Sequence, residues 1–194
     1  MFTGIINHLG TITDNSNTHL TIQVPVDLYK QLNHGMSIAV NGTCLTVVKQ
    51  IDPDQFRIEF MPETAKKTTM GTLKKNDVVN LELPVTTATL FAGHIVQGHV
   101  DDVATISSIK NEGNSRLIIF NISPSISKYI VEKGSITVNG ISLTVIDVTH
   151  DSFSVGIIPH TWTHTMLHTT QAGSKVNIEV DVLAKYVEKL QQSS

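Results

Sequence analysis

Val40-Asn-Gly-Thr-Cys-Leu-Thr-Val47 recurs in the second half of the chain as Val138-Asn-Gly-Ile-Ser-Leu-Thr-Val145, with six of eight positions identical. In each octet Asn-Gly separates two runs of strand-forming residues, which is a strong short-range signal for a β-hairpin. The repetition indicates two structurally equivalent halves, each with its own pocket. Because Ser142 stands where the first octet has Cys44, the two pockets differ at one reactive atom, which suggests two like molecules bound in unlike roles.

The repeat extends well beyond the octets. Three further pairs of segments align at spacings of 94 to 97 residues: 3–6 with 97–100, 56–64 with 153–161, and 79–82 with 176–179. A period of this length is far too long for a solenoid and indicates a duplicated domain. We predict a first domain over residues 1–88, a second over 89–180, and a C-terminal helix over 181–194.

The extended segments of each half are rich in β-branched residues and predict short antiparallel strands. Outside the octets these segments are 9–13, 20–24, 56–60, 78–83, 103–109, 116–122, 153–158 and 175–180. About six strands in ~90 residues favour a small closed barrel. The predicted fold class is therefore all-β, with two tandem six-stranded antiparallel Greek-key barrels. Short helices are expected at 26–32, 63–69, 125–132 and 160–167.

The last segment, residues 181–192, has no counterpart in the first half. Its apolar residues recur at helical spacing on one face. They are Val182, Leu183, Tyr186, Val187 and Leu190. Such a helix either packs on its own chain or joins subunits, and we favour a role in assembly.

Composition narrows the class of protein. Lys and Arg total 14 against 17 Asp and Glu among 194 residues, without the concentrated basic face that a nucleic-acid partner requires. No apolar run approaches the ~20 residues of a membrane span, and the N-terminus lacks a secretory signal pattern. The single cysteine excludes an internal disulfide and fits a reducing compartment. We expect a mildly acidic, soluble protein of the cytoplasm.

Each octet places two polar side chains on one face of a strand, because residues two apart in a strand share a face. These pairs are Cys44 with Thr46 and Ser142 with Thr144, with a leucine between them facing the other way. A free cysteine is most often a small buried hydrophobe, and that interpretation of Cys44 stays open. Its serine counterpart favours the floor of a ligand site over a core layer.

Histidines provide the other candidate chemistry. In Gly93-His-Ile-Val-Gln-Gly-His-Val-Asp101 the glycines permit close backbone approach and two histidines titrate near neutral pH, although a polar connecting segment would read similarly. His160, His164 and His168 could share one helical face. A solvated face explains that row better than a metal site, since no Cys, Asp or Glu with ligand spacing lies nearby.

Several enzyme classes lack their sequence signals here. The chain has no Gly-rich phosphate-binding or dinucleotide-binding pattern and no Gly-x-Ser-x-Gly motif. The sequence thus argues against kinases, NAD-dependent dehydrogenases and serine hydrolases.

Five segments in this order closely resemble the riboflavin synthase family, over essentially the whole chain: Met1–Ile6, Val40–Val47, Gly93–Asp101, Val138–Val145 and Val176–Asp181. The resemblance implies two six-stranded barrels and a homotrimer that the C-terminal helix helps to form. It also implies that two molecules of 6,7-dimethyl-8-ribityllumazine react, with a four-carbon unit passing from one to the other, to give riboflavin and 5-amino-6-(ribitylamino)uracil. No cofactor or metal is implied, and an association with lumazine synthase is left open.

The resemblance further implies a site between the first barrel of one subunit and the second barrel of its neighbour. It lines the first barrel's pocket with Gly4, Ile5, Ile6, Cys44, Leu45, Thr46, Glu59, Phe60, Met61, Pro62, Glu63 and Thr64, and Ser37 is a further expected substrate contact. It lines the second with Gly98, His99, Val100, Lys133, Ser142, Leu143, Thr144, Ile158, Pro159, His160, Thr161, Trp162 and Thr163. The expected catalytic residues are Cys44, His94, His99 and Ser142, without an assigned nucleophile.

One departure from the family bears on these roles. Asn139 stands where the family often has aspartate, so an acid–base role at that position is in doubt. The main alternative function is that of the lumazine proteins of luminous bacteria, which resemble riboflavin synthase and hold a fluorescent ligand without converting it. Those proteins lack the Gly-His-x-x-x-Gly-His segment, whereas His94 and His99 are both present here.

Overall fold

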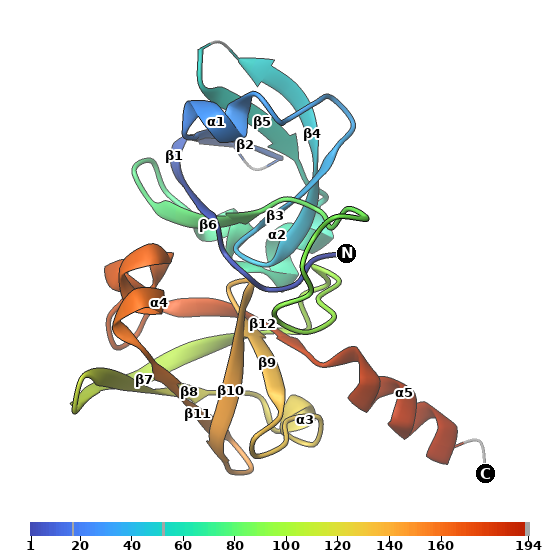
Figure 1. The fold of residues 1–194 in the computed structure, drawn as a ribbon. Helices are drawn as coiled ribbons and strands as arrows, with labels where there is room; N and C mark the ends of the chain where they lie inside the picture. The colour runs from blue at the N-terminus through green and yellow to red at the C-terminus, as the bar shows by residue number, and fades with distance from the viewer. Residues whose placement is uncertain (17, 52, 193–194) are drawn as a thin grey trace.

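Two closed six-stranded antiparallel barrels stack on each other in the computed structural model, which describes the chain except residues 17, 52 and 193–194 (Figure 1). The strands of the first barrel are β1 (His8–Ser16), β2 (His19–Gln23), β3 (Ser37–Val40), β4 (Thr43–Ile51), β5 (Gln55–Glu59) and β6 (Val78–Glu82). The strands of the second are β7 (Asp102–Glu112), β8 (Ser115–Asn121), β9 (Ser135–Val138), β10 (Ile141–Val148), β11 (Ser152–Ile157) and β12 (Lys175–Val180).

The strand order is the same in both barrels. It runs β1-β2-β5-β4-β3-β6 in the first and β10-β11-β8-β7-β12-β9 in the second, which is the same circuit entered at a different strand. In each circuit a three-strand meander lies beside an earlier strand, as in a Greek key. The predicted fold class is confirmed, and each barrel closes around its own apolar core.

The short helices differ from their predicted lengths. Single turns α1 (Val26–Tyr29) and α3 (Pro124–Ser127) replace the longer helices expected there. The helices expected at 63–69 and 160–167 are each divided, into α2 (Pro62–Lys67) with η1 (Thr69–Thr72) and into α4 (Pro159–His164) with η2 (Met166–Thr169).

A threonine causes each division. Thr68 and Thr165 are extended (φ −134° and −127°), and their hydroxyl oxygens accept the N–H of the residue two positions later. The 3₁₀ turn that follows is thereby capped, as threonine favours. One consequence is that His168 lies on η2 and not on α4, so the predicted three-histidine helical face does not form. His160 and His164 do stack, with ring centroids 4.1 Å apart.

The C-terminal helix α5 (Val182–Gln191) projects from the second barrel (Figure 1). Its polar side is tied to that barrel, by an ion pair of 2.6 Å between Lys185 and Asp101 and by contacts of Glu188 with Lys128 and Tyr129. Its exposed apolar side chains are Leu183, Tyr186, Val187 and Leu190. The helix is therefore held by its polar face, with its apolar face turned outward. Among the described residues, no helix is both long and apolar enough to cross a membrane.

The two Asn-Gly turns of the repeated octets meet at the seam between the barrels. Asn41, Gly42, Asn139 and Gly140 all have positive φ (44°, 75°, 46° and 80°), as a type I′ hairpin turn requires. A Cβ on Gly42 would lie 2.6 Å from the backbone nitrogen of Gly140. Glycine is thus required there both by the turn and by the packing of one barrel on the other.

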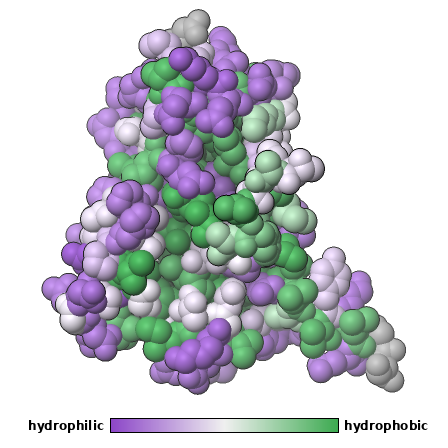
Figure 2. Space-filling view, viewed as in Figure 1, coloured by the Kyte–Doolittle hydropathy of each residue, from purple (hydrophilic) through white to green (hydrophobic). Residues whose placement is uncertain are grey.

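Two buried asparagines bond the barrels across this seam. The Nδ2 of Asn80 donates to the carbonyl of Asn139 (2.9 Å), and the Nδ2 of Asn177 donates to the carbonyl of Asn41 (2.8 Å). Asn139 Oδ1 also accepts the backbone N–H of Asn177. Asn139 is thus part of the seam. Hydrophobic surface gathers at this waist of the molecule on the face shown in Figure 2.

Candidate active site

The polar pairs of the two octets face away from the barrel cores. On β4 the side chain of Leu45 is 7% exposed and belongs to the first core, whereas Cys44 is half-buried and Thr46 exposed. On β10 Ser142 is half-buried and Thr144 exposed. Each pair therefore presents a thiol or hydroxyl on the outer surface of its barrel, as the alternation of the octets predicted.

Cys44 lies in an apolar niche. It packs against a small cluster of buried residues made of Phe2, Ala39 and Val96. Ala39 is its partner in the β3–β4 register, and Phe2 bridges to Val96. Cys44 is neither a fully buried core residue nor an isolated surface thiol.

Ser142 has polar neighbours instead. Its hydroxyl oxygen lies 2.7 Å from Nδ1 of His94, and Nε2 of the same ring lies 3.2 Å from the hydroxyl of Thr137. Thr137 is the register partner of Ser142, in the place that Ala39 occupies beside Cys44. The two equivalent positions thus differ in their surroundings as well as in their reactive atom.

Burial lowers the pKa of His94, and the negative charge of Asp181 offsets this only in part. His94 is 8% exposed, and its lowered pKa favours the neutral imidazole at pH 7. A neutral imidazole at this distance can accept a proton from Ser142 or donate one to it.

Two short segments cross the seam, and each is hydrogen-bonded to the octet strand of the other barrel. We call residues 3–5 the first crossing segment and residues 97–99 the second. The carbonyl of Gly98 accepts the N–H of Cys44, and the carbonyl of Gly4 accepts the N–H of Ser142, each at 2.8 Å. The resemblance assigned Gly4–Ile6 to the first barrel's pocket and Gly98–Val100 to the second's, whereas the carbonyls of Gly4 and Gly98 contact the octet strand of the other barrel. Each segment precedes its own barrel in sequence and contacts the other one through its glycine carbonyl.

A buried glutamate of the segment's own barrel anchors each crossing segment. Glu82 on β6 accepts the backbone N–H of Thr3 (2.7 Å) and of Gly4 (3.0 Å), and also the Thr3 hydroxyl. Glu179 on β12 accepts the N–H of three consecutive residues, 97, 98 and 99, at 2.6, 2.9 and 3.0 Å. Burial raises the pKa of both carboxyls, and these N–H bonds counteract the rise.

Other expected residues of the first site continue from Cys44 along its sheet. Ser37 pairs with Thr46, which pairs in turn with Glu59. Beyond Glu59 and Phe60, the side chain of Met61 is 68% exposed, and Pro62 starts α2, which also carries Glu63 and Thr64. Of these residues Phe60 is buried in the first core, whereas the outside of the barrel exposes Thr46, Glu59, Met61, Pro62 and Glu63.

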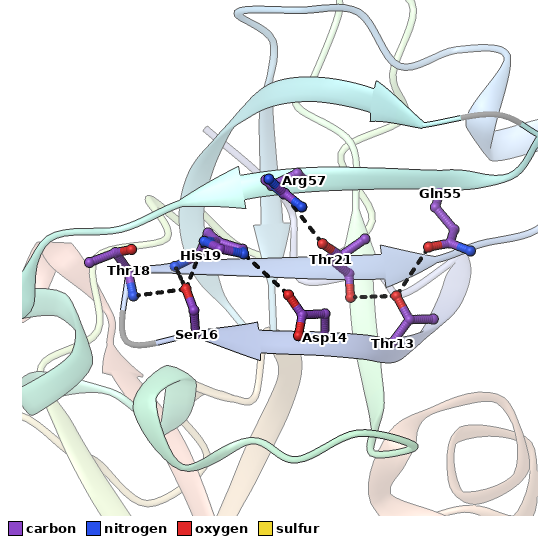
Figure 3. A network of polar contacts seen from close by, with 8 residues as sticks. All are labelled: Thr13, Asp14, Ser16, Thr18, His19, Thr21, Gln55 and Arg57. Carbon is purple, nitrogen blue, oxygen red and sulfur yellow. Dashed lines mark hydrogen bonds and ion pairs between the residues drawn. The ribbon is translucent and has the colours of Figure 1, made fainter.

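A polar network fixes the strands next to Glu59 (Figure 3). His19, the register partner of Glu59 on β2, is hydrogen-bonded to Ser16 (2.6 Å) and to Asp14 (3.2 Å). On the same face Arg57 Nε donates to the Thr21 hydroxyl. The network holds β1, β2 and β5 in place at the edge of the first site.

The second site has matching parts. Ile158 is 58% exposed where the first has Met61, and Pro159 starts α4. The Arg116 guanidinium lies 3.9 Å from the ring centre of Trp162 and steadies this helix. Lys133 is exposed and has a φ of 62°, a strained value for lysine. The remaining expected residues are Leu143, which packs partly on the second core, and His160, Thr161 and Thr163 of α4.

The family described as "Lumazine binding domain" matches residues 3–84 and 97–181, one copy for each barrel. A riboflavin synthase of Actinobacillus pleuropneumoniae is 44% identical over 192 residues, covering 97% of this chain and 89% of the relative. The riboflavin synthase of Bacillus subtilis is 42% identical, covering 96% of this chain and 88% of the relative. The chain belongs to the riboflavin synthase family. That of Mycobacterium tuberculosis is 41% identical over the full length of both chains.

This member of the riboflavin synthase family closely resembles solved structures of a related protein. A structure of LumP complexed with 6,7-dimethyl-8-(1'-D-ribityl)lumazine is 27% identical, with a TM-score of 0.83, and covers 93% of this chain and 99% of that one. LumP complexed with riboflavin gives a TM-score of 0.85. The double-barrel fold is thus shared with a protein that holds such ligands.

Sequence reasoning missed three polar residues that surround the riboflavin synthase motifs in this chain. They are Thr137, Glu82 and Glu179. A signal for the glutamates was present, because the repeat includes Val79-Asn-Leu-Glu82 and Val176-Asn-Ile-Glu179. A glutamate recurs at the same place in both strands, and a buried glutamate is costly without hydrogen-bond partners.

Proposed function

We propose that this protein converts two molecules of 6,7-dimethyl-8-ribityllumazine into riboflavin and 5-amino-6-(ribitylamino)uracil, acting as a transferase of a four-carbon unit. The observation that carries the proposal is the inequality of its two lumazine-binding halves. Cys44 lies among apolar side chains, whereas the equivalent Ser142 is hydrogen-bonded to the buried His94. A dismutation needs one molecule as donor and an identical one as acceptor, and two similar but unequal sites supply those roles.

The chemistry needs two rings held face to face, removal of a proton from the C7 methyl group, and addition of a nucleophile to the other ring. Holding the rings together supplies a large share of the rate, because the step becomes effectively unimolecular. His94 is neutral near pH 7 and can take a proton through Ser142. The Cys44 thiol and the His99 imidazole supply the corresponding groups beside the other lumazine ring.

We further propose that the reaction takes place between subunits of a homotrimer, with the first barrel of one subunit facing the second barrel of another. On the outer faces of the barrels Thr46 and Thr144 are exposed and Cys44 and Ser142 are half-buried. Met61 and Ile158 are exposed apolar side chains that follow β5 and β11. A second subunit would cover these faces and exclude water. The apolar face of α5 is the surface proposed for assembly, and the domain limits at residues 88 and 180 belong to the same proposal.

Localisation and partners are proposals as well. The single free cysteine, Cys44, suits the reducing cytoplasm. An association with lumazine synthase stays a prediction.

A direct assay tests the function. Purified protein is incubated with 6,7-dimethyl-8-ribityllumazine as the sole small molecule, and riboflavin is followed by absorbance. We expect one riboflavin for every two molecules consumed. A double variant with His94→Gln and Ser142→Ala is the control for conversion without the protein's chemistry.

The second candidate function is ligand storage without turnover, which the similarity to LumP structures favours. Tight, fluorescent binding of the lumazine with no riboflavin formed would establish that function and refute the synthase. The presence of both His94 and His99 argues for the enzyme.

A further inference from the structure

Glu179 connects the second barrel to the reactive thiol of the first through a single residue. Its carboxylate accepts the N–H of Gly98 at 2.9 Å, and the carbonyl of Gly98 accepts the N–H of Cys44 at 2.8 Å. Glu179 is 4% exposed, and its neighbouring bonds to residues 97 and 99 leave the segment little freedom. Charge-assisted bonds of this kind are short and strong, so the carboxylate fixes the segment's height above β4.

The backbones of Gly98 and Cys44 are in such close contact that the second crossing segment cannot shift toward β4. A Cβ on Gly98 would lie 2.6 Å from the Cβ of Cys44, and the φ of Gly98 is +80°. The backbone of the second crossing segment therefore rests directly on the β4 backbone beside the thiol. A shift of the segment must change the space around Cys44 and the direction of His99, the next residue.

The first crossing segment repeats this arrangement in the opposite direction. Glu82 of the first barrel holds the N–H of Gly4, whose carbonyl accepts the N–H of Ser142 on the second barrel. A Cβ on Gly4 would again lie 2.6 Å away, from the Cβ of Ser142. Each buried carboxylate is thus linked, through the backbone of a single glycine, to the residue of the other barrel that carries the hydroxyl or the thiol.

We propose that Glu82 and Glu179 are positioning residues for the reaction, each setting the geometry of the site on the opposite barrel. The proposal rests on the function proposed above, since it assigns a role at those two sites. Neither carboxylate is a reacting group, because each one is buried behind the backbone that it holds. Glu179 governs the Cys44 site, and Glu82 governs the Ser142 site.

Replacement by glutamine removes this control while keeping the size of the side chain. A glutamine has one carbonyl oxygen and one NH₂ group, and the NH₂ would face backbone N–H donors. At Glu179 at least one of the bonds to residues 97–99 is then lost. Aspartate keeps the charge but is one methylene shorter, so it draws the segment away from the opposite barrel.

The thiol of Cys44 gives a readout that does not depend on turnover, because it is the sole cysteine of the chain. We would measure the rate of its alkylation by iodoacetamide in the full-length wild type, in Glu179→Gln and in the matched Glu82→Gln. Glu82 lies in the same barrel as Cys44, where its register partner Ala39 is also that of Cys44. If the sheet transmits the change, the alkylation rate should therefore respond to Glu82→Gln. If the crossing segment transmits it, the rate should respond to Glu179→Gln.

We expect Glu179→Gln to change the alkylation rate several-fold and Glu82→Gln to leave it close to wild type. A reciprocal set, built on Cys44→Ser with Ser142→Cys, places the sole thiol on the second barrel. In that set the response should move to Glu82→Gln. If either glutamine variant does not fold by circular dichroism, the aspartate variant takes its place with the same expected pattern.

Steady-state kinetics provide the functional arm. Both glutamine variants should lower kcat by roughly tenfold or more, since small misplacements of reacting groups are costly, with a smaller effect on KM. An alkylation rate that follows the carboxylate of the same barrel, or that responds equally to both variants, overturns the proposal. A protein that forms no riboflavin but shows the expected alkylation pattern refutes the proposed function and leaves the positioning geometry supported.

Discussion

Nδ1 of His94 lies 2.7 Å from the hydroxyl oxygen of Ser142, while Nε2 of the same buried ring lies 3.2 Å from the hydroxyl of Thr137. A neutral imidazole carries one N–H, so one of these contacts is donated by the ring and the other accepted. The three side chains form one hydrogen-bonded chain whose proton positions are linked. Removal of the Thr137 hydroxyl should therefore alter the hydrogen bond between the His94 ring and Ser142.

If His94 and Ser142 act as one unit, their substitutions are not additive. His94→Gln and Ser142→Ala should each lower kcat by about 100-fold or more, the usual contribution of acid–base catalysis. The double variant should lose little beyond either single one. Riboflavin formation by the three variants measures this, with His150→Gln at an exposed turn as the control. Losses that multiply would show that the two residues act separately.

Stability should fall on acidification because of His94. Burial lowers the pKa of this residue in the folded protein below its unfolded value of about 6.5. Between the two pKa values the unfolded chain binds more protons than the folded one, so the free energy of unfolding rises with pH across that window. The contribution of His94 to stability is lost as the pH falls through the same window. Glu82 and Glu179, whose pKa is raised, act with the opposite sign.

The contribution of His94 is isolated by comparison with His94→Gln. Urea unfolding at pH 5 and pH 8 should show a smaller advantage of the wild type at pH 5. The glutamates are common to both proteins, so their effect cancels. Parallel pH dependence in the two proteins would exclude a buried neutral His94.

Gly98→Ala and Gly35→Ala separate steric contact from backbone strain. Both glycines have positive φ (80° and 82°), but a Cβ on Gly35 meets nothing within 4 Å. Gly35→Ala should cost about 1–2 kcal/mol from the left-handed backbone alone. Gly98→Ala should cost roughly 1–3 kcal/mol more, because its Cβ would overlap Cys44. Urea midpoints check this, and equal losses would mean that the crossing segment moves freely.

Cys44→Ala should reduce turnover more than it reduces binding of the lumazine. In the proposed reaction the ligand binds to the wider surface around Thr46 and Glu59, which pair on β4 and β5, whereas the thiol takes part in the chemical step. Cys44→Ser should not restore the rate, because the niche of Phe2, Ala39 and Val96 offers no partner like His94. Fluorescence titration and kcat measured side by side test this. Equal losses in both quantities would remove the chemical role of Cys44.

Removal of residues 183–194 should convert the proposed homotrimer to monomers without unfolding either barrel. The deleted segment carries the exposed apolar face, and Val182, which is buried, is retained. Each large apolar side chain buried between subunits contributes about 1.5–3 kcal/mol. Sedimentation analysis of the truncated chain and of Tyr186→Glu with Leu190→Glu measures the change. Exposed Gln191→Glu is the control, and an unchanged mass after truncation would refute the role of α5.

Much of the fold was predictable because the octets carry both the turn and the alternation of the strands. The Asn-Gly pairs fixed the hairpins β3–β4 and β9–β10, and the outward direction of Cys44 and Ser142 follows from the position of one leucine. The strand limits agree with the predicted segments to within a few residues.

The crossing segments could not be predicted from the repeat. Aligning residues 3–6 with 97–100 shows that the segments are equivalent, but equivalence holds whichever barrel each one contacts. The pairing of Thr137 with His94 was hidden for a related reason, since it joins a strand to a connecting segment of different sequence. Such tertiary contacts have no local sequence pattern, so they become visible only in the folded structure.

The seam has the contact pattern of a two-fold symmetric dimer. Each half offers an asparagine, an Asn-Gly turn and an amino-terminal segment, and each finds its partner in the same groups of the other half. Two separate single-barrel chains could complete each other by these isologous contacts. In such a dimer, however, both reactive positions would have to carry the same residue. Residues 85–96 join the halves covalently, and this link allows position 44 to be cysteine while position 142 is serine.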